Sequence, residues 1–372
     1  MASGKRAGAI WCVRPIWCEA SRGCGVEALG SPRDALVRSL GLECTLPAPK
    51  PCQWGWRYGQ IDPHEHCVLV IGAFDGVHRG HQDLIRQGAL QARELGVPLV
   101  ILTFDPDPSA VLGTPEPQLL LTQDRFRQLW ALGPQELRVC AFTEKLAALS
   151  PEEFLDRAVF GDGLSPCLVC VGEGFALGAQ GKGTVPYLSS LGKARGFRLL
   201  AQPLLSLEGA PVSATRIRQE IASGDTLKAA RLLGRRPFVR GTVMRGRGQG
   251  TSFGFPTANL MCAPGTALPA SGVFAGFGVL DGSAWPAAIN VGEPPTFKSQ
   301  GLQSSQGFLE ATLLGFSQDI YGDSMAIVLY ERLRPSRPFD SFEELVATVR
   351  TNMDQVRERY GEGPLKLISP VR

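Results

Sequence analysis

The chain has 372 residues, of which 44% are hydrophobic and 20% are charged, and its formal net charge is +3. This composition is ordinary for a globular protein, and the length suffices for two domains with cores of their own. The small net charge gives no argument for nucleic-acid binding by itself. No apolar run approaches the length needed to span a bilayer, and the first residues lack the apolar core of a signal peptide. We therefore expect a cytoplasmic protein, with plastid targeting by the slightly basic start as the alternative.

The first 66 residues mix Gly, Pro, Cys and Trp without a hydrophobic period, so we expect an irregular N-terminal extension over 1–66. The chain has ten cysteines, but those in this extension lack the close pairs and neighbouring histidines of zinc sites. Cys167 and Cys170 form a C-x-x-C motif in an apolar strand, where their odd separation directs them to opposite faces. These patterns indicate reduced thiols rather than a metal or redox site.

The rest of the chain is organised around Gly72–His81, which joins a predicted strand at 67–71 to a helix that Gly96 ends. A second strand is predicted at 97–104. The joining stretch therefore lies at the carboxyl end of a strand, where open α/β sheets bind ligands. Its glycines allow close backbone approach, and a helix N-terminus favours anions. His78 and His81 can share one helix face, which suits nucleotide phosphates; two solvated loop histidines are the alternative.

Strands and helices continue to alternate as far as Gly234. The predicted elements are strands at 136–142, 166–171 and 197–202, a capping box at Ser150–Glu153, and helices that run from Ser213 to Gly224 and from Asp225 to Gly234. This alternation predicts a parallel, doubly wound sheet and an α/β domain over 67–234.

The pattern changes after Gly234. From Phe238 to Arg334 short β-rich runs alternate with glycine turns, which predicts a closed antiparallel barrel. An apolar stripe from Ser341 to about Tyr360 predicts a final helix. We therefore expect a second domain, a β-barrel with a C-terminal helix, over 235–372. Because the motifs of the two domains do not interleave, we expect the domains to be separable.

The string Phe-Asp-Gly-Val-His-x-Gly-His at 74–81 resembles the FMN adenylyltransferase module of bacterial bifunctional riboflavin kinase/FAD synthetases. That module is a Rossmann-like nucleotidyltransferase domain. Val212–Arg218 resembles the second signature of the same superfamily; a capped helix with exposed arginines is the alternative. The resemblance implies that His78 and His81 are catalytic. It also implies ATP and phosphate binding by Gly72, Phe74, Asp75, Gly76, Gly80, Ser213, Thr215, Arg216 and Arg218.

Three positions depart from the family pattern in this domain. Asp107 stands where a histidine is usual, Gly174 where an Asn or Asp is usual, and Ala176 where an Arg is usual. We expect a nucleotide or flavin contact to be missing at Gly174 and Ala176, and Asp107 to repel a phosphate if it faces the site. A riboflavin kinase with a degenerate adenylyltransferase domain is therefore an alternative to the bifunctional enzyme.

In the second domain, a glycine-rich loop leads into Gly254-Phe-Pro-Thr-Ala-Asn259, which resembles the riboflavin kinase signature. An arginine common in the loop is replaced by Thr251. The resemblance implies that Glu310 is the catalytic base, and that Thr257 and Asn259 serve Mg²⁺, or alternatively Mn²⁺, with ATP. It further implies flavin binding by Arg334 and Phe339. The phosphate-binding glycines of the loop would be Gly246, Gly248, Gly250 and Gly254.

No acidic residue occurs between Asp225 and Asp281, so the arginines there predict an anion-attracting surface near the loop. They are Arg235, Arg236, Arg240, Arg245 and Arg247. A non-enzymatic RNA-binding barrel would use such a surface, but it would need interleaved aromatic residues, and 235–250 offers only Phe238. We expect instead that the chain phosphorylates riboflavin to FMN with ATP and adenylylates FMN to FAD with release of pyrophosphate. No nucleic-acid or membrane partner is expected.

Overall fold

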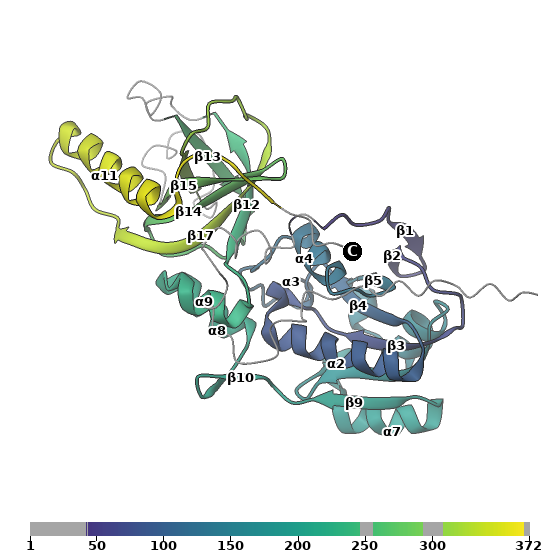
Figure 1. Ribbon diagram of the computed structural model, residues 1–372. Coiled ribbons are helices and arrows are strands. Elements are labelled where there is room, and N and C mark those ends of the chain that lie inside the picture. The colour runs from purple at the N-terminus through teal and green to yellow at the C-terminus, as the bar shows by residue number, and fades with distance from the viewer. Residues whose placement is uncertain (1–41, 43, 246–255, 293–307, 368–372) are drawn as a thin grey trace, which may run out of the picture.

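The computed structural model describes residues 42, 44–245, 256–292 and 308–367. Figure 1 shows an α/β body in purple to teal and a green to yellow barrel, with two helices between them. Among the described residues no helix combines the length and the apolarity that a membrane crossing requires.

The first body is built on a seven-stranded sheet with the order β1-β2-β5-β4-β3-β6-β9. Its strands are β1 (Lys50–Cys52), β2 (Gly55–Gly59), β3 (His66–Ile71), β4 (Leu99–Asp105), β5 (Glu136–Ala141), β6 (Ser165–Gly172) and β9 (Arg198–Gln202). The strands β5, β4, β3, β6 and β9 are all parallel. The chain adds β4 and β5 on one side of β3 and then adds β6 and β9 on the other side. The predicted doubly wound sheet is therefore confirmed, and its switch point lies beside the loop that follows β3.

The helices of this body cover the sheet and carry its loops. They are α2 (Arg79–Leu95), α3 (Pro108–Val111), α4 (Thr122–Trp130), α5 (Glu144–Ala147), α6 (Pro151–Phe154), α7 (Val185–Arg195), α8 (Ala214–Ser223) and α9 (Thr226–Leu233). Shorter elements are the 3₁₀ turns η3 (Asp75–Val77) and η5 (Ala179–Gly181) and the π-helix η4 (Leu155–Phe160). Two short hairpins join β7 (Ala176–Leu177) to β8 (Gly183–Thr184) and β10 (Ser206–Leu207) to β11 (Ala210–Pro211). The predicted caps at Gly96, Ser150, Ser213, Asp225 and Gly234 are all present.

The expectation that 1–66 is irregular is wrong for the part from Lys50 to Gly59. Here β1 and β2 form a hairpin, and β2 pairs antiparallel with β5 at the edge of the sheet. Both strands are too short to show a period of their own. Their pairing depends on the free edge of β5, which lies about 80 residues away in the sequence. At Gly55 a Cβ would lie 2.1 Å from the carbonyl oxygen of Val139, so only glycine allows this approach.

The second body is a closed six-stranded antiparallel barrel, because β14 pairs with both β17 and β15. The ring runs β14-β17-β12-β13-β16-β15, and β18 (Leu365–Lys366) adds to β15. Its strands are β12 (Phe238–Met244), β13 (Thr257–Cys262), β14 (Gly272–Leu280), β15 (Ser283–Gly292), β16 (Phe308–Leu313) and β17 (Ser324–Pro335). The predicted final helix is α11 (Phe342–Tyr360), which packs on the outside of the barrel against β14 and β15.

The two bodies are joined by polar contacts as well as by the chain. The hydroxyl of Thr226 in α9 donates to the carbonyl oxygen of Tyr330 in β17 at 2.8 Å. Gln118 of the first body exchanges two backbone hydrogen bonds with the barrel loop at Gly265 and Ala267. The strands of the parallel sheet thus all precede Gly234 and those of the barrel all follow it, but the bodies touch along several segments.

The predicted anion-attracting arginine surface is wrong for three of its members. Arg235 is only 5% exposed, and its guanidinium turns toward the first body. Arg236 lies over the Tyr330 ring at 4.3 Å and donates to the carbonyl oxygen of the same residue. Arg240 pairs with the buried Asp124 of α4 at 2.9 Å. Docking of the two bodies buries Arg235 and pairs the half-buried Arg240, whereas Arg236 is engaged within the barrel itself. Sequence spacing could not reveal these contacts, and Arg247 lies outside the described residues.

Candidate active sites

The loop after β3 is a strained turn. Phe74 and Val77 have positive φ angles of 57° and 39°, and Gly76 between them has 70°. Such angles cost a residue with a side chain on the order of 1–3 kcal/mol, most of all a β-branched one. Two observations favour glycine at position 76. Its φ angle is positive, and a Cβ there would lie 2.7 Å from the Leu119 side chain, which would have to shift. A turn of this kind persists only where its surroundings hold it.

Most polar groups of this turn are hydrogen-bonded, to residues of the adjoining helix and of segments far away in the sequence. Arg125 of α4 donates to the carbonyl oxygen of Ala73 at 2.9 Å, and Gln82 donates to that of Val77 at 2.8 Å. The carboxylate of Asp75 accepts from the Leu119 amide at 3.1 Å and from the Arg218 guanidinium at 2.7 Å. Burial raises the pKa of Asp75, against the opposing effects of Arg218 and the Leu119 amide.

The turn presents His78 and His81 at the N-terminus of α2. Their rings stack with centroids 3.6 Å apart, and Phe74 meets the His81 ring edge-on at 5.3 Å. Burial lowers the pKa of His78 to about 3, with help from the charges of Arg235 and Arg218. Burial also lowers the pKa of His81 well below its usual range, with smaller effects of His78 and Arg125. Both imidazoles are therefore neutral near pH 7.

The neutral state fixes the tautomer of His78. Its Nδ1 accepts from the backbone amide of His81 at 3.4 Å, so the ring proton is on Nε2. His78 thus offers an N–H donor rather than a positive charge. Together with the amides at the start of α2, this donor suits a phosphate oxygen on which negative charge increases during a reaction.

The second signature lies directly against the first. A Cβ at Gly80 would be 3.2 Å from the His78 ring and 3.5 Å from the carbonyl oxygen of Val212. Ser213 caps α8 by accepting from the Arg216 amide, and Thr215 is exposed in the first turn. The two arginines are partly engaged: Arg216 donates to the carbonyl oxygens of Leu207 and Ala210, and Arg218 to that of Pro117. Their predicted phosphate contacts stay predictions.

The departures from the family pattern have different structural settings. Asp107 caps α3, accepts from the amide and hydroxyl of Ser109, and lies 3.8 Å from the Arg125 guanidinium, so its charge is partly compensated. At Gly174 a Cβ would meet no atom within 4 Å, so nothing in the fold requires glycine there. Ala176 is exposed in β7. The structure thus offsets the repulsion expected from Asp107 but supplies nothing in place of the other two side chains.

Arg125 is a functional candidate that sequence reasoning missed. It is 4% exposed, donates to Ala73 and to the carbonyl oxygen of Phe104, and is close to both Asp105 and Asp107. Burial lowers its pKa, and its Nε is buried without a hydrogen-bond partner. The available signal was one of two arginines in a polar helix, which by itself resembles a solvated residue.

The low pKa of the buried histidines predicts acid sensitivity. Since the unfolded chain binds protons near pH 6.5 and folded His78 only near pH 3, stability is full above about pH 6.5 and falls as the pH falls toward 3. We expect a loss on the order of 2–4 kcal/mol. Urea unfolding at pH 7.0, 5.5 and 4.5 should show it, and His78→Gln should reduce the slope. Asp75, with its raised pKa, contributes with the opposite sign, so the comparison of variant and parent isolates the His78 share.

The second candidate site lies on the outer face of the barrel. Strand register places Asn259 of β13, Glu310 of β16 and Asn290 of β15 directly opposite one another. Their neighbours Ala258, Leu309 and Ala311 are buried in the barrel interior, so these polar residues face outward. The hydroxyl of Thr257 donates to Glu310 at 2.7 Å. Thr257, Asn259 and Glu310, predicted from separate motifs, are thus brought together.

Asn259, Glu310 and Asn290 form a row across neighbouring strands, and this row continues to the predicted flavin-binding residues. Asn290 lies opposite Val273 of β14, and Val273 lies opposite Arg334 of β17. Arg334 is therefore three strands from Glu310, or about 14 Å at usual strand spacing. Its guanidinium lies 5.5 Å from the centroid of the Phe339 ring, which also contacts Arg337 at 4.7 Å. Asn290 is the polar member of this row to which the sequence assigned no role.

The glycines predicted to bind phosphate in the second domain, Gly246, Gly248, Gly250 and Gly254, lie outside the described residues, as does Thr251. They occupy the connection between β12 and β13, which ends directly before Thr257.

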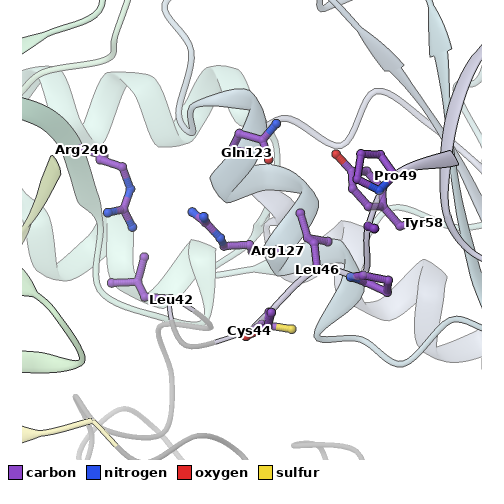
Figure 2. A pocket seen from close by; sticks show the side chains of 11 residues that line it. Leu42, Cys44, Leu46, Pro49, Tyr58, Gln123, Arg127 and Arg240 are labelled. Atoms are coloured by element: carbon purple, nitrogen blue, oxygen red, sulfur yellow. The ribbon is translucent and has the colours of Figure 1, made fainter. Parts of the chain in front are cut away.

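A cavity of about 590 Å³ lies apart from both sites, between the segment 42–49, α4 and the barrel. Figure 2 shows Arg127 and Arg240 on one side of it and Tyr58 and Pro49 on the other. Both arginines pair with the buried Asp124. Neither the histidine pair nor Glu310 lines this cavity, so it adds nothing to the catalytic sites.

Fold and sites together define a two-domain transferase, with a Rossmann-like nucleotidyltransferase domain followed by a kinase barrel. Residues 60–216 match the family model of FAD synthetase and residues 233–360 that of riboflavin kinase. The chain belongs to the family of bifunctional riboflavin kinase/FMN adenylyltransferases.

Two relatives of that name and one solved structure illustrate the match. The protein from Bacillus subtilis is 34% identical over 292 residues, which cover 77% of this chain and 90% of the relative. That from Pseudomonas fluorescens is 34% identical over 296 residues, covering 79% and 93%. A crystal structure described as a macrolide-efflux protein from Streptococcus pneumoniae superposes with a TM-score of 0.70 at 30% identity, covering 80% of this chain and 96% of that one.

Proposed function

We propose that this chain makes FMN from riboflavin and ATP on the barrel, and FAD from FMN and ATP on the α/β domain, with the boundary at Gly234. The observation that carries the proposal is the meeting of two distant signatures, where Gly80 lies against both His78 and the carbonyl oxygen of Val212. This places a strained, glycine-lined helix N-terminus, a neutral histidine donor and the capped start of α8 around one small volume.

In the adenylyl transfer, the phosphate of FMN attacks the α-phosphorus of ATP and the bond to the β-phosphate breaks, releasing pyrophosphate. The neutral His78 donates through Nε2 to an oxygen of the reacting phosphates, and His81 supports that ring by stacking and by its amide. The amides at the start of α2 and the hydroxyl of Thr215 provide further donors. No covalent intermediate is needed, because orientation and electrostatic stabilisation suffice.

In the kinase reaction, Glu310 takes the proton of a ribityl hydroxyl as its oxygen attacks the γ-phosphorus of ATP, and ADP leaves. Thr257 orients the carboxylate through its hydrogen bond. A hydroxyl and an amide offer hard oxygen ligands of the kind that Mg²⁺ prefers, so Thr257 and Asn259, beside the carboxylate of Glu310, fit the ion. When bound, Mg²⁺ would neutralise charge on the ATP phosphates. The flavin ring would extend along the row toward Arg334 and Phe339.

The alternative function, a kinase with a degenerate first domain, is favoured by Gly174 and Ala176. Against it stand the complete set of contacts that hold the histidine turn and the compensation of Asp107 by Arg125. Loss of one hydrogen bond at Gly174 costs about 0.5–1.5 kcal/mol, or a threefold to tenfold effect. Reduced adenylyl transfer is therefore expected rather than none.

Two ATP analogues separate the proposed reactions on the unmodified chain. With Mg²⁺ and α,β-methylene-ATP, riboflavin should yield FMN that accumulates, since the bond needed for adenylyl transfer cannot break. With β,γ-methylene-ATP, supplied FMN should yield FAD, while riboflavin should stay unphosphorylated. Removal of the metal with EDTA should stop both reactions, and Mg²⁺ or Mn²⁺ should restore them. No FAD from FMN with either ATP or the second analogue would favour the kinase with a degenerate domain.

A further inference from the structure

Arg235 directly follows Gly234, the C-cap of the helix α9 that closes the α/β domain, and its side chain folds back against that domain. Its Nη2 donates to the carbonyl oxygen of Gly76 at 2.9 Å. Gly76 lies in the middle of the strained turn that presents His78 and His81. Through this bond its carbonyl oxygen is held by a residue from outside the turn. Arg235 therefore does for Gly76 what Arg125 does for Ala73 and Gln82 for Val77.

The buried position of Arg235 is energetically unfavourable for a charged guanidinium. Burial lowers the pKa of Arg235 to about 10, so it keeps its charge near pH 7. Its Nε and Nη1 are buried without hydrogen-bond partners, and Asp75 and Asp124 act on it only through space. A buried cation without a paired carboxylate usually costs several kcal/mol relative to an apolar residue of similar volume. The guanidinium also lies 5.7 Å from the centroid of the Phe238 ring, a cation–π contact that offsets only part of this cost. Stability of the fold alone is therefore a weak reason for an arginine here.

Most of the buried side-chain nitrogens that lack a hydrogen-bond partner among the described residues lie close together. Among the described residues, five buried side-chain nitrogens lack a partner, and four of them surround this turn: Nδ1 of His81, Nε of Arg125, and Nε and Nη1 of Arg235. Polar atoms left unsatisfied together in this way mark a place where function rather than stability has set the residues. A turn with two positive-φ side chains needs this set of contacts to keep its shape.

We propose that Arg235 is a positioning residue for adenylyl transfer, which holds the Gly76 turn and thereby the histidine pair from the first position of the second domain. The proposal rests on the adenylyl-transfer function proposed above. It makes adenylyl transfer depend on how the barrel is docked, because Arg235 leads directly into β12. Two neighbouring contacts act in the same direction: Gln118 binds the barrel loop beside Leu119, whose amide holds Asp75, and Arg240 of β12 pairs with Asp124.

The test compares Arg235→Met and Arg235→Lys with Arg236→Met in the full chain. Arg236 is a matched control, because its loss removes the same charge one residue away, and the contacts it makes within the described part of the chain are to Tyr330. We expect Arg235→Met to lower kcat for FAD formation from FMN at least tenfold, since small misplacements of reacting groups cost up to about 100-fold. Arg235→Lys should lose about threefold, because one ammonium donor replaces the guanidinium. KM for ATP and FMN formation from riboflavin should change less than about twofold.

A second readout follows the histidines directly. The chain has four, of which His64 and His66 are exposed, so NMR titration can resolve the buried pair. Removal of the Arg235 charge should raise the pKa of His78 in Arg235→Met but not in Arg236→Met. This difference would show that the Arg235 charge acts on the pair in solution. The result that a merely structural role would not produce is a lower kcat for FAD formation at unchanged KM, with most of the activity kept in Arg235→Lys.

Several results would overturn the proposal. Unchanged kcat for FAD formation in Arg235→Lys or Arg235→Met is one, and equal losses in Arg235→Met and Arg236→Met are another. If Arg235→Met fails to fold, Arg235→Lys decides alone. Failure of the underlying function is distinct, because the unmodified chain would then make no FAD at all.

Discussion

Glu310→Gln should lose FMN formation while keeping FAD formation from supplied FMN. The amide has almost the shape of the carboxylate and can still accept from the Thr257 hydroxyl, so the fold around β16 should persist. It cannot take a proton from the attacking hydroxyl, and general-base catalysis is worth roughly 10²–10⁴-fold. The loss should appear in kcat when FMN is separated from riboflavin by chromatography.

Glu331→Gln is the matched control for this experiment. Glu331 also lies on a barrel strand and accepts a hydrogen bond from a hydroxyl, that of Tyr360 at 2.7 Å, but it is not in the row of Glu310. It should retain FMN formation. Near-normal FMN production by Glu310→Gln would contradict the assignment of the base.

His81→Ala should abolish FAD formation and leave FMN formation from riboflavin in place. The change removes the ring that stacks on His78 and opens a cavity next to Phe74, so the Nε2 donor of His78 loses its orientation. Removal of one donor to a developing negative charge costs about 10²–10³ in kcat. Pyrophosphate release in the presence of FMN and ATP measures the effect.

His66→Ala supplies the control, because His66 is exposed at the start of β3, in the same strand that leads to the turn. Its FAD formation should equal that of the unmodified chain. If His81→Ala loses both activities together, the effect is one of folding. If it keeps FAD formation within a few-fold, the histidine pair is not the adenylyl-transfer site.

Local patterns predicted most of the fold. The apolar run before Gly72, the helical spacing after it and the capping residues at Ser150, Ser213 and Asp225 each specify their element through neighbours in the sequence. The closed barrel followed from glycine turns between short β runs, although its register did not. The hairpin at Lys50–Gly59 was missed because its structure depends on the free edge of β5.

The residues of the candidate sites likewise divide into those that local motifs predict and those that only long-range contacts reveal. The motifs predicted which residues matter at the turn and on β13, since these lie close together in sequence. The contributions of Arg125, Asn290 and Arg235 come from long-range contacts: a side chain from α4, a strand register and the docking of two domains. The arginine cluster after Gly234 was misinterpreted for that reason, because Arg235 and Arg240 contact partners more than 100 residues away.

The central claim, two successive reactions on one chain, is tested most directly by supplying only riboflavin, ATP and Mg²⁺ and measuring all products over time. We predict that FMN appears first and then declines as FAD forms, and that each FAD is accompanied by one ADP and one pyrophosphate. FMN that accumulates without FAD or pyrophosphate, at high ATP and with either Mg²⁺ or Mn²⁺, would contradict the account.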